Sequence, residues 1–154
     1  MLVCILYIAL WGLAAFPIGR LLRKRHFMPL AFPFRPFTFE KGGKIYDCLR
    51  IKQWAKLLPD ISKTFSGYMP KKKLSTDIAD IETFIQETCV AELIHGFLCC
   101  TGLLCIPLWP TGGIWVYIIY LILGNLPYII IQRYNRPRLL RLLSRLKIRE
   151  EITL

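Results

Sequence analysis

The sequence predicts an all-α integral membrane protein with about three transmembrane helices, an N-terminal anchor and a C-terminal hairpin, together with interfacial amphipathic helices. Apolar residues make up 55% of the 154 residues, yet 21 residues are Lys or Arg and 10 are Asp or Glu. Hydrophobicity above the usual range of soluble domains must therefore be segregated into blocks. Three blocks reach the length of roughly 20 residues that a helix needs to cross hydrocarbon: Met1–Gly19, Leu93–Trp109 and Ile114–Ile131.

These blocks divide one membrane domain, residues 1–154, into segments. The short turn Pro110-Thr-Gly-Gly113 separates the last two blocks and predicts an antiparallel hairpin. We expect a first transmembrane helix (1–19), a cytoplasmic and interfacial region (20–76), a helix entering the second span (77–109), a third span (114–132) and a basic interfacial helix (137–150).

The first block could instead be a cleaved signal peptide. A signal peptide carries its charge before the apolar stretch and ends in a small-residue cleavage site. Here the basic run Arg20, Arg23, Lys24 and Arg25 follows the block, and no such site precedes the run. The order of charge favours a membrane anchor.

Basic residues predict the orientation. Fourteen lie from Arg20 to Lys73, between the first and second spans, and the other seven lie from Arg133 to Arg149, after the third. The positive-inside rule places both regions in the cytoplasm and the N-terminus outside. Basic residues that flank apolar spans, without a nucleic-acid motif, favour lipid headgroups over nucleic acid as partner.

Six cysteines without a CxxC pair are interpreted as apolar packing residues.

Several segments outside the spans have an interfacial character. Residues 27–39 hold five phenylalanines and three prolines, so we expect an irregular apolar segment. Apolar spacing predicts a helix over 45–58 and another that starts near Asp77, with Ser75 and Thr76 as capping candidates. In 137–150 a leucine stripe is flanked by arginines, the pattern of a helix that lies in the plane of an anionic membrane interface. A solvated tail helix or an oligomer contact is the alternative.

Ionisable residues stand where the second span enters the membrane, and groups at membrane depth are costly and often functional. If the hairpin turn is centred near residue 111.5, positions summing to 223 share one depth. Glu87 then faces Arg136, Glu92 lies beside Gln132, and His95 faces Tyr128. This spacing predicts a polar patch at the cytoplasmic edge of the bilayer, formed by Glu87, Glu92, His95, Asn125, Gln132, Arg133, Asn135 and Arg136.

Pro127 adds to this patch because its missing N–H frees the carbonyl of Leu123, near Asn125. Three interpretations remain open at this stage. The patch is a functional site, or Glu87–Arg136 and Glu92–Arg133 are ion pairs that fasten the hairpin. A metal site is the third, because Glu-x-x-His is half of a carboxylate-bridged metal motif; with one copy of the motif, no metal is expected.

Two runs resemble the signature of the glycosyl-4,4'-diaponeurosporenoate acyltransferase family, small bacterial membrane proteins of staphyloxanthin-type carotenoid biosynthesis. They are Glu87-Thr-Cys-Val-Ala-Glu-Leu-Ile-His95 and Asn125-Leu-Pro-Tyr-Ile-Ile-Ile-Gln-Arg-Tyr-Asn-Arg-Pro-Arg138. The likeness extends to Phe39–Lys44, to the stretch around Ile51–Lys56 and to the order of the spans, so it covers most of the chain. Gly96 departs from the pattern, because a tryptophan is expected after the histidine, and this bears on the identity of the substrate.

The resemblance implies transfer of a fatty acyl group from a thioester donor, such as acyl-coenzyme A, to a hydroxyl of a glycosylated lipid at the bacterial cytoplasmic membrane. No other cofactor is expected. His95 would be the general base, with Glu92 or Glu87 orienting it. Asn125 and Arg133 would donate to the oxyanion. Substrate-binding residues would be Gln132, Arg133, Asn135, Arg136 and Arg138, with the last two attracting donor phosphates.

The expected partners are therefore membrane lipid, the glycosylated acceptor and the thioester donor, and a second copy of the chain is left open. The competing hypothesis is a non-enzymatic membrane scaffold or lipid-binding subunit with an ion-paired hairpin. An acyltransferase needs a cleft that admits an acyl chain, whereas a scaffold needs every carboxylate paired.

Overall fold

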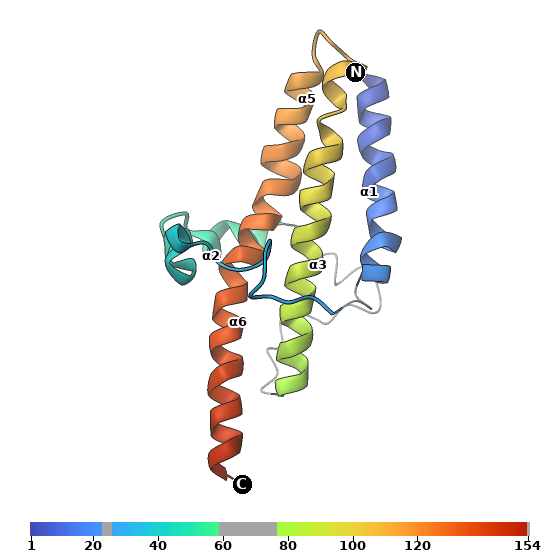
Figure 1. Ribbon diagram of the computed structural model, residues 1–154. Coiled ribbons are helices and arrows are strands. Elements are labelled where there is room, and N and C mark those ends of the chain that lie inside the picture. The colour runs from blue at the N-terminus through green and yellow to red at the C-terminus, as the bar shows by residue number, and fades with distance from the viewer. Residues whose placement is uncertain (23–25, 59–76, 154) are drawn as a thin grey trace. The chain divides into compact units, whose positions relative to one another are not determined.

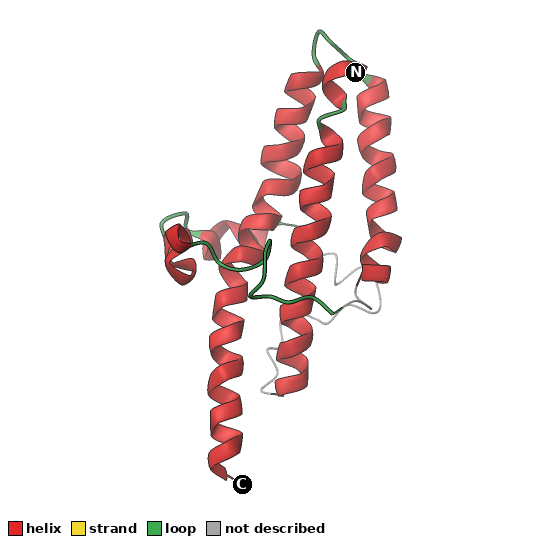
Figure 2. Cartoon of the chain, in the orientation of Figure 1, coloured by secondary structure: helices red, strands yellow, loops and turns green. Residues whose placement is uncertain are grey.

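The computed structural model describes residues 1–22, 26–58 and 77–153. Within these ranges the chain is helical with connecting turns and contains no strand (Figure 2). Three helical stretches are long and apolar enough to cross a membrane: Leu2–Leu22, Ile78–Leu108 and Gly113–Ile152. The predicted fold class, an all-α membrane protein with three spans, is confirmed.

The chain forms two compact units. The hairpin unit consists of Met1–Phe27 and Cys89–Gln132, and the arginine unit consists of Met28–Thr88 and Arg133–Leu154. Helices α3 (Ile78–Gly102) and α6 (Leu126–Thr153) contribute residues to both.

In the hairpin unit, α1 (Leu2–Leu22) lies along α3 (Figure 1). The hydroxyl of Tyr7 donates to the carbonyl of Thr101 at 3.1 Å, and the ring of Trp11 meets the ring of Phe97 edge to face at 5.2 Å between centroids. Most large side chains of α1 are exposed. Such a surface is expected of a helix that faces lipid, because hydrocarbon solvates it without cost.

Helix α3 begins after Asp77, whose Oδ1 accepts a hydrogen bond from the backbone N–H of Ala79 at 3.0 Å. A short carboxylate side chain in this position satisfies one of the donors that the first turn leaves without a helical partner. The helix then runs without a break into the second apolar block, as the sequence predicts. The two predicted capping residues, Ser75 and Thr76, lie outside the described residues.

A hairpin joins α3 to the third span. After α3 the chain forms a short helix α4 (Cys105–Leu108) and turns at 109–112 into α5 (Gly113–Ile119), which lies beside α3 (Figure 1). A Cβ on Gly113 would overlap the backbone carbonyl of Cys105, so only glycine permits this close approach. The antiparallel hairpin predicted from the Pro110–Gly113 turn is confirmed.

The third span continues from α5 through a π-helical turn, η4 (Tyr120–Asn125), into α6. The segment 137–150, predicted as an interfacial helix, is the C-terminal part of α6. Pro137 lies within α6, and the helix continues on both sides of it.

The arginine unit contains the proline-rich segment, which is irregular as predicted and has a cis peptide bond between Phe32 and Pro33. It leads into the 3₁₀ element η1 (Thr38–Asp47), α2 (Ile51–Trp54) and η2 (Ala55–Leu57). The prediction of one helix over 45–58 is wrong, because Arg50 adopts a left-handed backbone conformation (φ 49°) that interrupts it.

Candidate functional site

A histidine–asparagine pair lies inside the hairpin unit. The ring nitrogen Nδ1 of His95, on α3, is 3.0 Å from Oδ1 of Asn125, on η4. Asn125 is only 1% exposed, and His95 is half-buried. Thirty residues separate the two side chains in sequence, so the hairpin brings them together.

The π-helical turn explains how Asn125 is held. In η4 the backbone widens, so that the N–H of Leu126 donates to the carbonyl of Leu121, five residues back. The side-chain nitrogen Nδ2 of Asn125 donates to the carbonyl of Tyr120 at 3.1 Å. Pro127 stands two residues after Asn125 and has no N–H to continue the regular pattern. The weakened turn expected around Asn125 is therefore present, as a π-helix, a form that is frequent at functional sites.

These contacts show which nitrogen of the histidine ring carries a hydrogen. A backbone carbonyl can only accept, so Asn125 must present its NH₂ group to Tyr120 and its oxygen to His95. A ring nitrogen that faces an oxygen acceptor must itself carry the hydrogen. Nδ1 of His95 is thus the donor, and whenever the ring is neutral its lone pair is on Nε2.

Tyr128 completes the local geometry. Its ring stacks on the ring of His95 with centroids 4.5 Å apart and planes within 3° of parallel. This confirms that His95 and Tyr128 share one depth in the hairpin. Two further predicted residues of this unit, Glu92 and Gln132, are buried, with exposures of 8% and 7%. Stacking and the Nδ1 hydrogen bond together hold the imidazole in one orientation.

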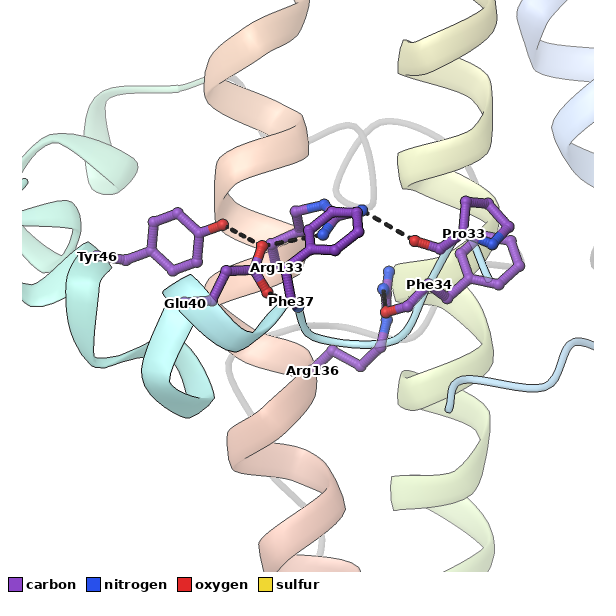
Figure 3. A network of polar contacts seen from close by, with 7 residues as sticks. All are labelled: Pro33, Phe34, Phe37, Glu40, Tyr46, Arg133 and Arg136. Carbon is purple, nitrogen blue, oxygen red and sulfur yellow. Dashed lines mark hydrogen bonds and ion pairs between the residues drawn. The ribbon is translucent and has the colours of Figure 1, made fainter. Parts of the chain in front are cut away.

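The other predicted site residues belong to the arginine unit, where they organise the segment from Pro33 to Asp47. Arg133 donates to the Glu40 carboxylate at 2.9 Å and to the Pro33 carbonyl at 2.9 Å (Figure 3). Glu40 is 1% exposed and also accepts from the hydroxyl of Tyr46 at 2.6 Å and the backbone N–H of Phe37 at 3.0 Å. The guanidinium of Arg133 lies over the Phe37 ring at 4.6 Å.

Arg136 is buried at 1% exposure. Its Nε and Nη2 donate to the side-chain hydroxyl and the carbonyl of Thr88, both at 2.9 Å. Its Nη1 donates to the carbonyl of Phe34 at 2.7 Å (Figure 3). Thr88 is the neighbour of Glu87 in sequence, so Arg136 lies close to the depth that the hairpin spacing predicts. A guanidinium can satisfy three acceptors at once because its donors form a planar fork.

Arg138 lies nearer the surface. It donates to the Tyr134 carbonyl at 2.7 Å and to Asp47 at 2.9 Å, and it stacks over the Tyr134 ring at 3.5 Å. Asn135 is half-buried on the same helix, as is Glu87 on α3. The nine predicted residues thus divide into four in the hairpin unit and five in the arginine unit.

Sequence reasoning missed the partners of the arginines. Phe34 comes from irregular chain, and Glu40 and Tyr46 come from η1, which is interrupted at 41–43, so spacing predicts no distance for these three. Thr88 is an ordinary helical residue. Glu40 had one signal, because it stands in the Phe39–Lys44 stretch that carries the family resemblance. Among the residues described, no group of three or more His, Cys, Asp or Glu side chains is placed to hold a metal.

Comparisons with known proteins agree with the resemblance found in the sequence. Residues 31–145 match the family model of glycosyl-4,4'-diaponeurosporenoate acyltransferases. The protein of that name from Staphylococcus aureus strain MRSA252 is 33% identical over 150 residues, which cover 96% of this chain and 90% of the relative. Those from strains bovine RF122 / ET3-1 and USA300 are 32% and 31% identical over the same shares. No solved structure matches. The chain therefore belongs to the glycosyl-4,4'-diaponeurosporenoate acyltransferase family.

Proposed function

We propose that this protein transfers a fatty acyl group from a thioester donor to a hydroxyl of a glycosylated carotenoid or a related membrane glycolipid. The names of its relatives support the acceptor class. A lipid acceptor also agrees with three helices long and apolar enough to cross a membrane, because such an acceptor is delivered within the bilayer.

The observation that carries the proposal is the oriented His95 ring. An acyl acceptor hydroxyl must lose its proton as its oxygen attacks the thioester carbonyl, and histidine is the commonest residue to accept it. The hydrogen bond from Nδ1 to Asn125 leaves the lone pair on Nε2. In this tautomer Nε2 is the ring nitrogen that can accept the proton.

The reaction balances without a further reactant. Nε2 of His95 takes the hydroxyl proton while the acceptor oxygen bonds to the acyl carbon, forming a tetrahedral intermediate. The carbon–sulfur bond then breaks, and the leaving thiolate takes the proton back from the imidazolium. The products are the acylated glycolipid and a free thiol, and the histidine returns to its starting state.

Asn125 acts in this mechanism as a positioning residue. Its oxygen holds His95, one amide hydrogen is used by the Tyr120 carbonyl, and its side chain is almost fully buried. Orientation of His95 by Glu92 or Glu87, an oxyanion contact from Arg133, and substrate binding by the polar residues of α6 stay predictions. Arg133 and Arg136 serve at least one further role, since they hold the segment that contains Pro33, Phe34 and Glu40.

We further propose that the chemistry takes place at the cytoplasmic membrane edge, with the N-terminus outside and the C-terminus in the cytoplasm. The support is that all basic residues lie from Arg20 to Lys73 and from Arg133 to Arg149. Reporter fusions test this. Fluorescent protein at the C-terminus should be active, and alkaline phosphatase at that position should be inactive; the opposite pattern excludes the orientation.

The activity test uses single substitutions in membranes supplied with a radiolabelled acyl thioester and glycolipid acceptor. His95→Ala should lower acyl incorporation about 100-fold or more, the usual contribution of a general base. Asn125→Ala should lower kcat by about 10-fold or more, with the acceptor KM unchanged, because it removes only the restraint on the ring. His26→Ala, at the other, exposed histidine, is the matched control. Undiminished activity in both variants would exclude this mechanism.

A further inference from the structure

In the arginine unit, a turn that contains two glycines lies against α6. Lys41, Gly42 and Gly43 adopt positive φ angles of 46°, 63° and 90° in succession. A Cβ on Gly43 would lie 3.0 Å from Nη1 of Arg138. Glycine at this position therefore serves two purposes, because it permits the left-handed turn and leaves room for a guanidinium.

Several positively charged residues lie at this turn. Nη1 of Arg141 donates to the Gly42 carbonyl at 3.2 Å, so a second guanidinium lies against the same turn. Lys41 and Lys44 flank the glycines with exposed side chains, and neither has a polar partner among the residues that the structure describes. We call this group the glycine-turn cluster; it consists of Lys41, Gly42, Gly43, Lys44, Arg138 and Arg141.

One carboxylate, Asp47, offsets one of the four positive charges of the cluster through its ion pair with Arg138 at 2.9 Å. Glu40 is nearby in sequence but is buried and occupied by Arg133 and Tyr46. The cluster thus keeps a net positive charge at a partly exposed position. Like charges held together in this way are unfavourable unless an anion joins them.

Lys41 adds a second, independent observation. Left-handed backbone is unfavourable for residues with a Cβ, and glycine occupies it at no cost, as it does at the next two positions. A lysine here strains the turn and carries its ammonium group on an exposed side chain. Strain of this kind concentrates at ligand-binding sites.

We propose that the glycine-turn cluster binds a phosphate group. Guanidinium forks match phosphate oxygens in geometry, and lysines supply point charges that add attraction. A phosphate of this kind is carried by a soluble donor such as coenzyme A and also by anionic lipid headgroups. Assignment of the phosphate to the acyl donor rests on the proposed function, whereas the phosphate site itself does not.

The test measures binding by the full-length protein in a neutral detergent, using calorimetry and thermal shift. One arm titrates coenzyme A and inorganic pyrophosphate. The other titrates short-chain phosphatidylglycerol, with short-chain phosphatidylcholine as the neutral reference. Saturation in the first arm alone identifies a soluble phosphate, and saturation with phosphatidylglycerol alone identifies a headgroup; both outcomes support the site.

Variants connect the binding to the cluster. The pair Lys44→Ala with Arg141→Ala should weaken the bound probe at least 10-fold, because it removes two of the four cations. The pair Lys52→Ala with Arg145→Ala changes the net charge equally at exposed positions outside the cluster and should leave affinity within 2-fold. Lys41→Gly should weaken binding while relieving strain, and Arg50→Gly relieves the other left-handed position without affecting binding.

Two results would overturn the proposal: no saturable binding in either arm, or equal loss in the cluster variants and in their controls. His95→Ala should bind the probes as the wild type does. Loss of acyl transfer in that variant, with binding retained, keeps a failure of the proposed function distinct from a failure of the phosphate site.

Discussion

Different kinds of interaction stabilise the two units. In the hairpin unit, apolar helices approach closely at small residues such as Gly113, and the described hydrogen bonds across the helices include those of Tyr7 and His95. In the arginine unit, an irregular segment is fastened to α6 by Arg133, Arg136 and Arg138. In lipid the hydrophobic effect contributes little to the association of helices, because the lipid tails are themselves apolar. Close packing therefore supports the first unit, and charged hydrogen bonds support the second.

The largest expected effect of a substitution is at Arg136. Arg136→Leu leaves the carbonyls of Phe34 and Thr88 without this buried donor. The free energy of unfolding should fall by about 3 kcal/mol or more, because hydrogen bonds to charged groups contribute roughly 1.5–3 kcal/mol each. Thermal unfolding in detergent and protease cleavage within 28–50 would measure the loss. Arg145→Ala, at an exposed position of the same helix, should change neither.

The second-largest expected effect concerns the close packing of helices in the hairpin unit. In Gly113→Ala the added methyl group meets the backbone of Cys105 and Ile106, which cannot move aside as a side chain can. We expect destabilisation of about 1–3 kcal/mol, as for other overpacked sites. At Gly96 no atom lies within 4 Å of the added Cβ, so Gly96→Ala should leave the thermal midpoint unchanged or raise it slightly. Equal effects at the two glycines would contradict the role given to close packing.

The smallest effects compare one hydroxyl from each unit. Tyr46→Phe removes a 2.6 Å bond to the buried Glu40 carboxylate and should cost about 1.5 kcal/mol or more, because the acceptor is charged. Tyr7→Phe removes a 3.1 Å bond to a neutral carbonyl and should cost about 0.6 kcal/mol, typical between membrane helices. Both are measured as shifts of the thermal midpoint, and the reverse order would refute the distinction between the units.

Much of the fold could be predicted, because long apolar runs joined by one short turn allow few arrangements of the helices. The continuous helix from Ile78 into the second span and the shared depth of His95 and Tyr128 follow from helical rise alone. Glu40 was not predicted as the partner of Arg133, since its position depends on a proline-rich segment with no repeating geometry. Arg50 likewise interrupts a helix that periodicity favours, because a single left-handed residue leaves no mark on the apolar pattern.

The π-helical turn has a consequence for any comparison of this chain with shorter or longer sequences. Such a turn accommodates one residue more than an α-helix of the same length, so residues after Asn125 are rotated by about 100° relative to an unbroken helix. Removing one residue between Tyr120 and Pro127 would restore α-helical phase while keeping the span apolar. Asn125 would then turn away from His95. The number of residues between Tyr120 and Pro127 therefore determines whether the His95–Asn125 pair forms.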